Sequence, residues 1–293
     1  MKLDFKPVVA GDIEKLKPFY GLRPNKACDS VFLDCFLWKD YYHVECAVSE
    51  DRAALWLMER DGQVSTAMPM CREEDLPYFF HQLEEYFAEV LHKPFYIALA
   101  DEEAVQYLGL DPKEYEVEEQ EAMRTLAGKK LHKKKNHLNA FKREYEGRYE
   151  YRRLCCSDRH EVWEFMERWR QKKADADALE DSLEYEVAGI HEILKNCSSL
   201  SVRMAAVYVD GQMEAFTIGS LNERENMAVI HIEKANPDIK GLYQFINQQF
   251  LVHEFPDVAL VNREDDVGME GLRKAKMSYN PIGFARKYMV RKR

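Results

Sequence analysis

The amino-acid sequence predicts a mixed α+β fold built from two similar halves. The chain has 293 residues, which is long for one ordinary domain and comfortable for two of roughly 130–150 residues. Each half reads as strand, helix, hairpin, helix and strand, in that order. Each hairpin carries an Asp-Gly pair, at Asp61-Gly62 and at Asp210-Gly211, and this pair favours a two-residue turn.

The first half opens with a short strand, DFKPVV, and with a helix that begins at Asp12. Residues 30–70 are rich in β-branched and aromatic side chains, so we expect strands on both sides of Asp61-Gly62. Acidic residues open the helical pattern EEDLPYFFHQLEEYFAEVLHK, as the helix dipole favours. The half ends with the strand PFYIALA, the short helix DEEAVQYLGL and the extended segment YEVEEQEAMRTLAG.

The second half repeats this order. The strand YEYRRL precedes two helices, DRHEVWEFMERWRQKK and LEDSLEYEVAGIHEILKNC. The second hairpin is VRMAAVYVDGQMEAFTIGSLNE, and NMAVIHIEKA reads as a third strand. The remaining elements are the helix IKGLYQFINQQFLVHEF, the strand VALVNRED, the helix GMEGLRKAKMSY and the final strand IGFARKYMV.

Charge is unevenly placed in a chain whose formal net charge is −10. From Asp101 to Glu121 there are nine Asp or Glu and one Lys, and the basic segment GKKLHKKKNHLNAFKR follows with seven Lys or Arg. Such a reversal is typical of a domain junction or of two surfaces that face each other. We therefore predict a first domain at 1–127, a basic connecting helix at 128–147 and a second domain, with the active site, at 148–293.

The bulk composition excludes several classes of protein. No apolar run approaches the ~18 residues of a membrane helix, and the start, MKLDFKPVVAGD, lacks the apolar core of a signal peptide. The seven cysteines are scattered without C-x-x-C spacing. We expect reduced thiols in a cytoplasmic protein, with no zinc site and no disulfide-linked partner. The pI of about 5.5 argues against general coating of nucleic acid, although a local patch can still bind it.

The basic segment has two explanations. In a helix, Leu131, Leu138 and Phe141 form one apolar stripe and the lysines lie on another face. Lysines that only keep a helix soluble are normally mixed with glutamate at i,i+4 spacing, and the segment has none before Glu144. Either these lysines contact phosphates, on tRNA or on a cofactor, or they neutralise the preceding acidic segment. On the first explanation the phosphate contacts are Lys133, Lys134 and Lys135.

Three segments of the second half resemble the GCN5-related N-acetyltransferase (GNAT) superfamily. They are the hairpin followed by MAVIHIEKA, the turn into a helix at NPDIKGLYQF, and AKMSYNPIGF with Ala275, Tyr279 and Gly283 at intervals of four. In that superfamily the turn before the helix holds the pyrophosphate of coenzyme A, because its amide groups and the helix dipole attract phosphate. The resemblance implies a phosphate site at Lys240, Gly241 and Leu242.

A second resemblance covers nearly the whole chain. LAGKKLHKKKNHLNAF and NREDDVGMEGLRKAKMSYNP resemble the signature segments of the DUF2156 family. That family is related to the C-terminal domain of phosphatidylglycerol lysyltransferase and, more distantly, to the bacterial Fem peptidyltransferases. The resemblance implies two tandem GNAT-like acyltransferase domains. It also implies an aminoacyl-tRNA as the donor, rather than a coenzyme A thioester.

Acyl transfer to an amine or hydroxyl needs a base, a donor to the oxyanion and an acid for the leaving group. Glu233 is the expected base, and His231 is expected on the same side of its strand. The alternative for Glu233 is an ion pair with Lys234 or Arg203. Tyr279 is the expected acid, and its alternative is packing at the end of a helix.

The polar run after the strand VALV supplies further candidates. Asp265 and Asp266 follow a buried strand and precede a helix, where functional loops of α/β sheets gather. By resemblance, they line the site that receives the amino acid of the donor. Arg273 and Lys276 can share a helix face that suits a phosphate or carboxylate, and the alternative is a salt-bridged helix.

Three functions remain open at this point. The leading hypothesis is an acyltransferase that takes an aminoacyl group from aminoacyl-tRNA to an amine or hydroxyl acceptor. The second is a coenzyme A-dependent N-acyltransferase, and the third is a non-catalytic binding protein of the same fold. No metal is expected in any of them. The acceptor stays open, and a lipid acceptor would have to be reached from solution.

Overall fold

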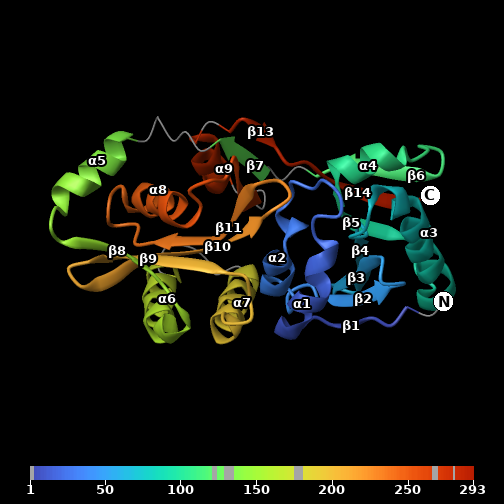
Figure 1. The fold of residues 1–293 in the computed structure, drawn as a ribbon, viewed down its shortest axis with the longest axis horizontal. Coiled ribbons are helices and arrows are strands. Elements are labelled where there is room, and N and C mark those ends of the chain that lie inside the picture. The colour runs from blue at the N-terminus through green and yellow to red at the C-terminus, as the bar shows by residue number, and fades with distance from the viewer. Residues whose placement is uncertain (1–2, 121–123, 129–134, 175–180, 266–269, 280) are drawn as a thin grey trace.

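Two mixed β-sheets lie side by side along the long axis of the molecule (Figure 1). The structure is a computed structural model that describes residues 3–120, 124–128, 135–174, 181–265, 270–279 and 281–293. Within these ranges each sheet has seven strands. The predicted mixed α+β class is therefore confirmed.

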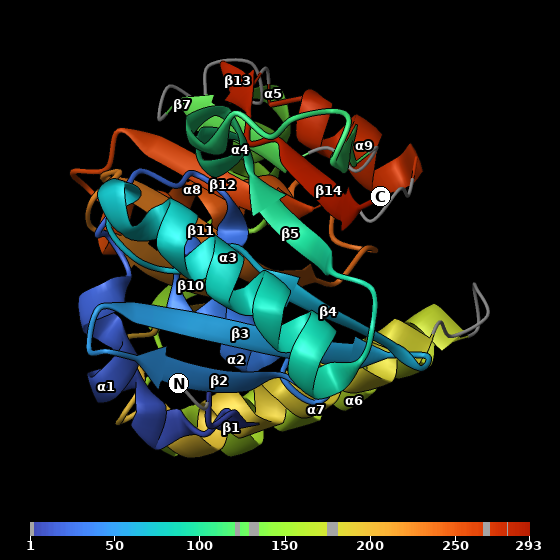
Figure 2. The ribbon, with the colours of Figure 1, turned by 90° about the vertical axis from the view of Figure 1, so that its right-hand side faces the viewer.

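The first sheet is covered by helices on both faces. Helix α3 crosses one face of it (Figure 2), while α1 and α2 pack on the other. The strand order is β1-β2-β3-β4-β5-β14-β6. Its strands are β1 (Lys6–Pro7), β2 (Glu45–Ser49), β3 (Ala53–Arg60), β4 (Gln63–Ala67), β5 (Tyr96–Asp101), β14 (Lys287–Lys292) and β6 (Tyr115–Glu119), and its helices are α1 (Ile13–Leu16), α2 (Phe32–Leu37), α3 (Leu76–Tyr86) and α4 (Glu102–Leu108).

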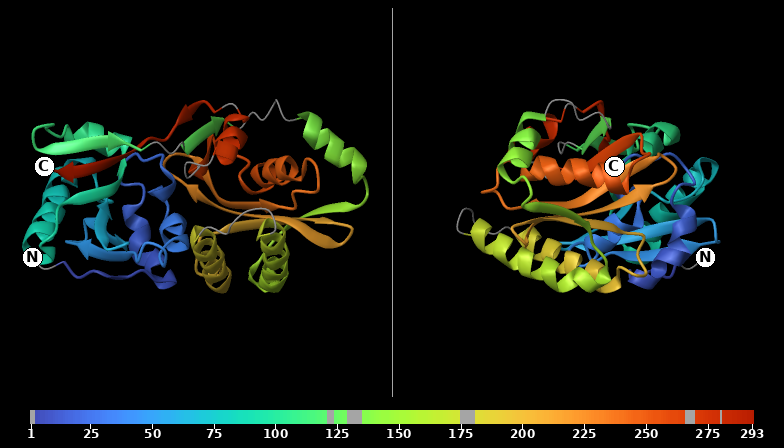
Figure 3. Two further views of the ribbon diagram at one scale, coloured as in Figure 1. Left: turned by 180° about the vertical axis from the view of Figure 1, so that it is seen from behind. Right: turned by 60° about the vertical axis from the view of Figure 1, so that its left-hand side comes forward.

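The second sheet has α6 and α7 on one face and α8 on the other (Figure 3). Its strand order is β13-β7-β12-β11-β10-β9-β8. Its strands are β13 (Gly283–Phe284), β7 (Arg124–Gly128), β12 (Leu260–Asp265), β11 (Met227–Ala235), β10 (Gln212–Asn222), β9 (Arg203–Val209) and β8 (Tyr149–Arg153). Its helices are α5 (Lys135–Glu144), α6 (Arg159–Ala174), α7 (Asp181–Asn196), α8 (Leu242–Glu254) and α9 (Glu270–Met277).

Both predicted hairpins form at their Asp-Gly pairs. Asp61 and Gly62 have φ angles of 52° and 78°, and Asp210 and Gly211 have φ angles of 50° and 81°. A positive φ at both central residues defines the turn that matches the twist of two antiparallel strands. The turn chemistry therefore fixes β3–β4 and β9–β10, as predicted.

The segment at 32–37 is a helix, where the sequence had suggested strands. Helix α2 buries Phe32, Leu33, Phe36 and Leu37, which recur at helical spacing. The aromatic and branched side chains of this segment resemble those of a strand. Packing against α7 determines the outcome: a Cβ atom on Gly189 of α7 would lie 2.1 Å from the carbonyl oxygen of Leu37, so the two backbones touch.

The two sheets exchange strands. β7, from the segment predicted to belong to the first domain, pairs with β12 in the second sheet. β14, from the end of the chain, pairs with β5 and β6 in the first sheet. Neither 1–127 nor 148–293 therefore completes a sheet by itself, and the division at 128–147 remains a prediction about domains.

One apolar core joins the two units. It combines Phe36 and Leu37 of α2 with Ile190 and Leu194 of α7 and with the sheet residue Phe216. All five side chains are almost fully buried, so separating the units would expose them to water at a cost of roughly 1.5–3 kcal/mol each. The hydrophobic effect therefore adds to the exchanged strands in holding the two units together.

Two further features concern single predictions. Cys156 and Cys197 form a disulfide between the start of α6 and the end of α7, so the expectation of reduced thiols is wrong for this pair. The two residues are 41 positions apart in the chain, and only the packing of α6 beside α7 brings them together. None of the helices within the described residues is long and apolar enough to cross a membrane.

Candidate active site

Strands β11 and β12 separate in the middle of the second sheet, and polar side chains fill the opening. The two strands are parallel and pair only at Met227–Leu260, Ala228–Val261 and Val229–Asn262. Beyond these pairs, β11 continues through His231 and Glu233, and β12 continues through Arg263 and Glu264. The register also shifts beside the opening, because Ile218 of β10 faces Ile232 whereas Gly219 faces Ile230. His231 is thus the extra residue of a β-bulge, a feature that often redirects a side chain at an active site.

His231 links two neighbouring strands through its two ring nitrogens. Nε2 lies 2.7 Å from the hydroxyl oxygen of Ser220 on β10, and Nδ1 lies 2.6 Å from a carboxyl oxygen of Glu264 on β12. The imidazole is fully buried, and burial lowers its pKa to about 4. At neutral pH the ring is therefore uncharged and holds Glu264 by a hydrogen bond.

Glu264 meets a second carboxyl group, from the other unit. Asp34 projects from α2, and its carboxyl, that of Glu264 and the imidazole of His231 place one polar atom each within 4.8 Å of one another. Asp34 also hydrogen-bonds Glu264. Two carboxylates this close cannot both remain ionised at low cost, so they share a proton.

Both carboxyl groups have raised pKa values. Burial, and then the nearby charge of Glu264, raise the pKa of Asp34 to about 7. Burial raises the pKa of Glu264 to about 8, and the charge of Glu186 adds to this rise. Carboxyl groups with pKa values near 7 exchange protons readily at neutral pH, which is the property of a general base.

Two lysines partly offset this accumulation of acid. Lys276 of α9 donates a hydrogen bond of 2.8 Å to the backbone oxygen of Glu264, and Lys287 of β14 lies 3.0 Å from Asp29. The side chain of Lys287 is only 3% exposed. The charge of Lys287 lowers the pKa of both carboxyls and that of Lys276 lowers the pKa of Glu264, against the effect of burial. The site therefore draws on β14 and α2 of the first unit as well as on the second sheet.

Asn262 fixes the conformation of Glu264. Its side-chain oxygen accepts a hydrogen bond of 2.8 Å from the backbone N–H of Glu264, whose φ of 56° is left-handed. Its amide group donates a hydrogen bond of 2.8 Å to the backbone oxygen of Lys26 in the first unit. A non-glycine residue with this φ is strained unless its surroundings hold it. The fully buried side-chain amide of Asn262 thus stabilises the left-handed backbone at Glu264 and links β12 to the first unit by a hydrogen bond.

Glu233, the predicted base, takes part in an ion pair instead of standing free. Its two carboxyl oxygens accept hydrogen bonds of 2.8 Å from Arg263 and 2.8 Å from Asn247. Of the two partners suggested for it, Lys234 bonds Glu186 instead, and Arg203 bonds a backbone oxygen of Glu254. Glu233 and His231 therefore have separate sets of partners.

Tyr279, the predicted acid, lies beside this ion pair. The guanidinium of Arg263 stacks 4.1 Å from the centre of its ring, and burial raises the pKa of its hydroxyl. The hydroxyl is therefore protonated at neutral pH and can donate a proton. Arg263 directly precedes Glu264 in β12, so the ion pair beside Tyr279 lies on the same strand as one member of the carboxyl pair.

The predicted phosphate site at the start of α8 is covered. Gly241 caps the helix with a φ of +84°, and a Cβ atom on it would lie 2.3 Å from the carbonyl oxygen of His137 in α5. Leu242 is buried in the core with Phe141 of α5, whereas Lys240 is exposed. Helix α5 therefore packs directly over this turn, as Figure 3 also shows.

The remaining predicted residues are placed only in part. Arg273 and Lys276 are half-buried on α9, and Lys276 reaches the carboxyl cluster. Asp265 ends β12 and Lys135 begins α5, but their side chains lie outside the described part of the chain. Lys133, Lys134 and Asp266 also lie outside it.

The sequence predictions missed Asp34, Ser220 and Lys287 altogether. Asp34 belongs to the segment that had suggested strands, and Lys287 belongs to the strand that crosses to the first sheet. Glu264 lay within the polar run NREDD, one residue before the acids that were chosen. A helical reading of residues 32–37 would have placed a lone acid, Asp34, among buried apolar side chains, and that signal was available.

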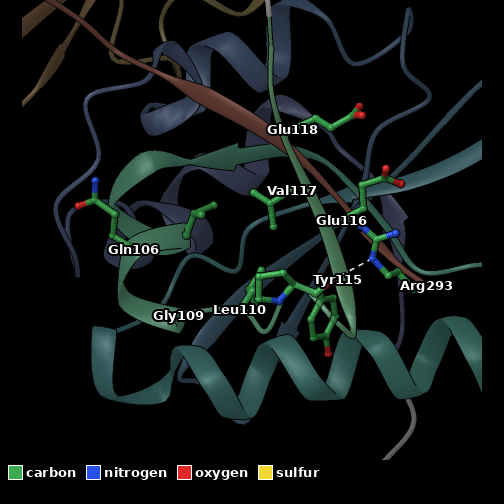
Figure 4. A pocket seen from close by; sticks show the side chains of 10 residues that line it. Gln106, Gly109, Leu110, Tyr115, Glu116, Val117, Glu118 and Arg293 are labelled. Carbon is green, nitrogen blue, oxygen red and sulfur yellow. Dashed lines mark hydrogen bonds between the residues drawn. The ribbon is translucent and has the colours of Figure 1, made fainter.

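A separate pocket of about 510 Å³ lies in the first unit, between α4 and β6. Its lining includes Val105 and Val117, and Figure 4 shows Glu116 and Glu118 on the opposite side of β6 from Val117. None of the residues of the carboxyl cluster contributes to it. Its lining residues, unlike the carboxyl cluster, do not include a histidine or a pair of carboxyls in contact.

Comparison with known proteins identifies relatives of the whole chain. The family described as phosphatidylglycerol lysyltransferase, C-terminal, matches residues 21–291. An uncharacterised protein of Mycoplasmoides gallisepticum is 30% identical over 168 residues, which are 57% of this chain and 52% of that protein. The chain thus spans about half the length of this curated relative.

Solved structures extend the likeness to the fold. A conserved protein of unknown function from Bacteroides thetaiotaomicron has a TM-score of 0.89 at 25% identity, with 100% of both chains covered. The C-terminal domain (DUF2156) of an Agrobacterium fabrum protein named as a lysylphosphatidylglycerol synthetase has a TM-score of 0.70 at 16% identity, covering 96% of this chain and 91% of that one. FemX has a TM-score of 0.62 at 9% identity, covering 98% and 96%. The predicted tandem GNAT-like, Fem-like architecture is confirmed.

Proposed function

Because the chain belongs to the phosphatidylglycerol lysyltransferase C-terminal family, we propose that it transfers an aminoacyl group from an aminoacyl-tRNA to an amine or hydroxyl acceptor. The observation that carries this proposal is the carboxyl pair of Asp34 and Glu264, in the opening between β11 and β12. An acceptor amine must lose a proton to become a nucleophile, and the pKa of about 7 at Asp34 suits that task.

The reaction assigns one role to each group. The acceptor nitrogen or oxygen attacks the ester carbonyl of the donor and gives its proton to the ionised carboxylate of Asp34. His231 and Lys276 hold Glu264 beside Asp34. The bond from the carbonyl carbon to the ribose oxygen breaks, and Tyr279 protonates that oxygen. The products are the aminoacylated acceptor and free tRNA; Asp34 releases its proton to solvent and Tyr279 takes one up, which restores both groups.

The charge of the opening favours an aminoacyl group over an acetyl group. An aminoacyl ester carries a free ammonium, which a shared carboxyl pair can accept by charge-assisted hydrogen bonds. An acetyl group offers no positive charge to compensate two buried acids. The carboxyl pair therefore supports an amino acid as the transferred group.

Coenzyme A is the second candidate donor, and the cover over α8 counts against it. Its pyrophosphate would need the amide groups of the turn at Gly241, where the carbonyl oxygen of His137 would lie 2.3 Å from an added Cβ atom. A third candidate, a binding protein without catalysis, is disfavoured by two titratable carboxyls held in one opening at a cost in stability. Lys133, Lys134 and Lys135 remain proposed contacts to the phosphates of tRNA.

A transfer assay tests the proposal. Purified protein is incubated with bulk tRNA charged with radiolabelled amino acids and with a mixture of primary amines and phospholipid vesicles. The rate of loss of label from tRNA above spontaneous hydrolysis is measured together with its appearance in each acceptor. A parallel series uses acetyl-coenzyme A. Transfer from tRNA that Asp34→Asn abolishes supports the proposal, whereas acetyl transfer alone would overturn it.

A further inference from the structure

An aromatic strip begins one helical turn beyond Asp34. The backbone N–H of Trp38 bonds to the oxygen of Asp34 at 3.3 Å, and the N–H of Tyr42 bonds to the oxygen of Trp38 at 3.1 Å. These i,i+4 bonds continue the path of α2, so Asp34, Trp38 and Tyr42 lie along one side of it. Tyr185 of α7 completes the strip, with its ring 5.2 Å from that of Tyr41.

The strip is partly open to solvent, and Arg60 lies beside it in an ion pair with Asp61, whose carboxyl oxygen is 3.3 Å from Nε of Arg60. Tyr42 and Tyr185 are both 39% exposed. Tyr41 contacts Trp38, Tyr42 and Tyr185 edge-on, and the guanidinium of Arg60 stacks 3.5 Å from the centre of its ring. Aromatic rings beside an arginine form the usual surface on which proteins stack unpaired nucleobases.

The strip lies next to the proposed active site. Tyr185 adjoins Glu186, whose charge contributes to the raised pKa of Glu264. The two backbone hydrogen bonds place Trp38 one turn and Tyr42 two turns beyond Asp34, past the end of α2 at Leu37. An aminoacyl ester held at Asp34 would therefore place its ribose and the adjoining bases along these two turns, because successive bases in a strand are ~3.4 Å or more apart.

We infer that the strip of Trp38, Tyr41, Tyr42 and Tyr185 binds the unpaired 3′-terminal nucleotides of the donor RNA by stacking. This inference rests on the proposed function and extends it to the way in which the donor is held. Stacking recognises the face of any base, and Arg60 adds a cation at the edge of the strip. The surface thus orients the ester toward the carboxyl pair, while the body of the tRNA contacts other residues.

Direct binding of RNA tests the strip without any catalytic readout. The probe is a fluorescein-labelled RNA of four nucleotides ending in CCA, titrated with purified protein and followed by anisotropy. Tyr42→Ala and Tyr185→Ala alter exposed side chains, so both variants are expected to fold, which circular dichroism checks. Each should weaken binding by roughly tenfold. Tyr107→Ala is the matched control, since Tyr107 is 47% exposed on α4, in the other part of the first unit.

The outcomes separate the strip from the proposed reaction. The inference that the strip binds RNA would be overturned if the wild type, Tyr42→Ala and Tyr185→Ala bound the short RNA equally well. It would also be overturned if the wild type did not bind the short RNA. In the transfer assay, both variants should raise KM for aminoacyl-tRNA and leave kcat near its wild-type value. If KM for aminoacyl-tRNA is the same in both variants as in the wild type, the role of the strip is refuted and the proposed reaction is not. If the variants bind the short RNA more weakly but neither they nor the wild type transfer an aminoacyl group, the proposed reaction is refuted and the role of the strip is not.

Discussion

Asp34 and Glu264 place their carboxyl groups side by side although one comes from α2, in the first unit, and the other from the end of β12. Burial raises the pKa of both carboxyls, and the charge of Glu264 raises the pKa of Asp34 further. The pair therefore exists only when both units are in place. Three consequences of the pair can be measured, and a fourth prediction concerns the turn before α8.

Asp34→Asn should abolish transfer and stabilise the protein at neutral pH. The amide cannot accept a proton, and loss of a general base typically costs 10²–10⁴-fold in rate. The amide also removes a buried charge, so the melting temperature at pH 8 should rise. The control is Asp40→Asn, at an exposed residue six positions further on that pairs with Lys39; it should change neither quantity. A variant that loses activity and stability together would indicate a structural role.

The rate of transfer should rise with pH through the pKa of Asp34. The ionised carboxylate is the active form, so kcat/KM is low at pH 5 and levels off above pH 7, given a pKa of about 7. His231 does not contribute to this limb, because its pKa of about 4 keeps it neutral throughout. A profile of kcat/KM from pH 5 to pH 9 is the measurement, and a flat profile would argue against Asp34 as base.

Stability should fall as pH rises over the same window. The pKa of Asp34 is 3.8 in an unfolded chain and about 7 in the folded protein, so the folded state holds more protons between these values. The free energy of unfolding is therefore greatest below the unfolded pKa and declines toward the folded one, by up to about 1.4 kcal/mol per pH unit for each such group. Urea denaturation at several pH values measures the slope. In Asp34→Asn the slope should be smaller, because only Glu264 still contributes.

Gly241→Ala should destabilise the protein more than Gly211→Ala does. Both glycines have a left-handed φ, of +84° and +81°, so alanine is strained at either position. Only at Gly241 does the added Cβ atom meet another segment, the carbonyl oxygen of His137. The difference in melting temperature between the two variants therefore reports the contact between α5 and α8. Equal effects would mean that α5 is free to move off the turn, and the coenzyme A hypothesis would regain support.

Local signals in the sequence were enough for much of the fold. The Asp-Gly turns, the glycine at the start of α8 and the helical patterns around α3 and α6 depend on neighbours a few residues away. The tandem architecture followed from the resemblance of two segments. These features were predicted because the information lies within single elements.

The candidate active site depends on contacts that no local pattern records. Asp34 reaches Glu264 because Gly189 lets α7 approach Leu37. His231 reaches Glu264 because both strands shift register at the opening. Glu233 sits on the predicted strand, but its partner Arg263 comes from the adjacent one. Such pairings are decided by tertiary packing, and the sequence indicates only that polar residues gather near the end of a buried strand.

The exchange of strands has a consequence for synthesis of the protein on the ribosome. β14 is the last element of the chain, yet it lies between β5 and β6 in the first sheet. The first sheet therefore keeps an unfilled gap until β14 has been synthesised, and pairings this distant in the chain form slowly. Lys287 arrives with the same strand, so a nascent chain that stops before β14 lacks one charge of the candidate site. The carboxyl cluster and its lysine can come together only after β14 has left the ribosome.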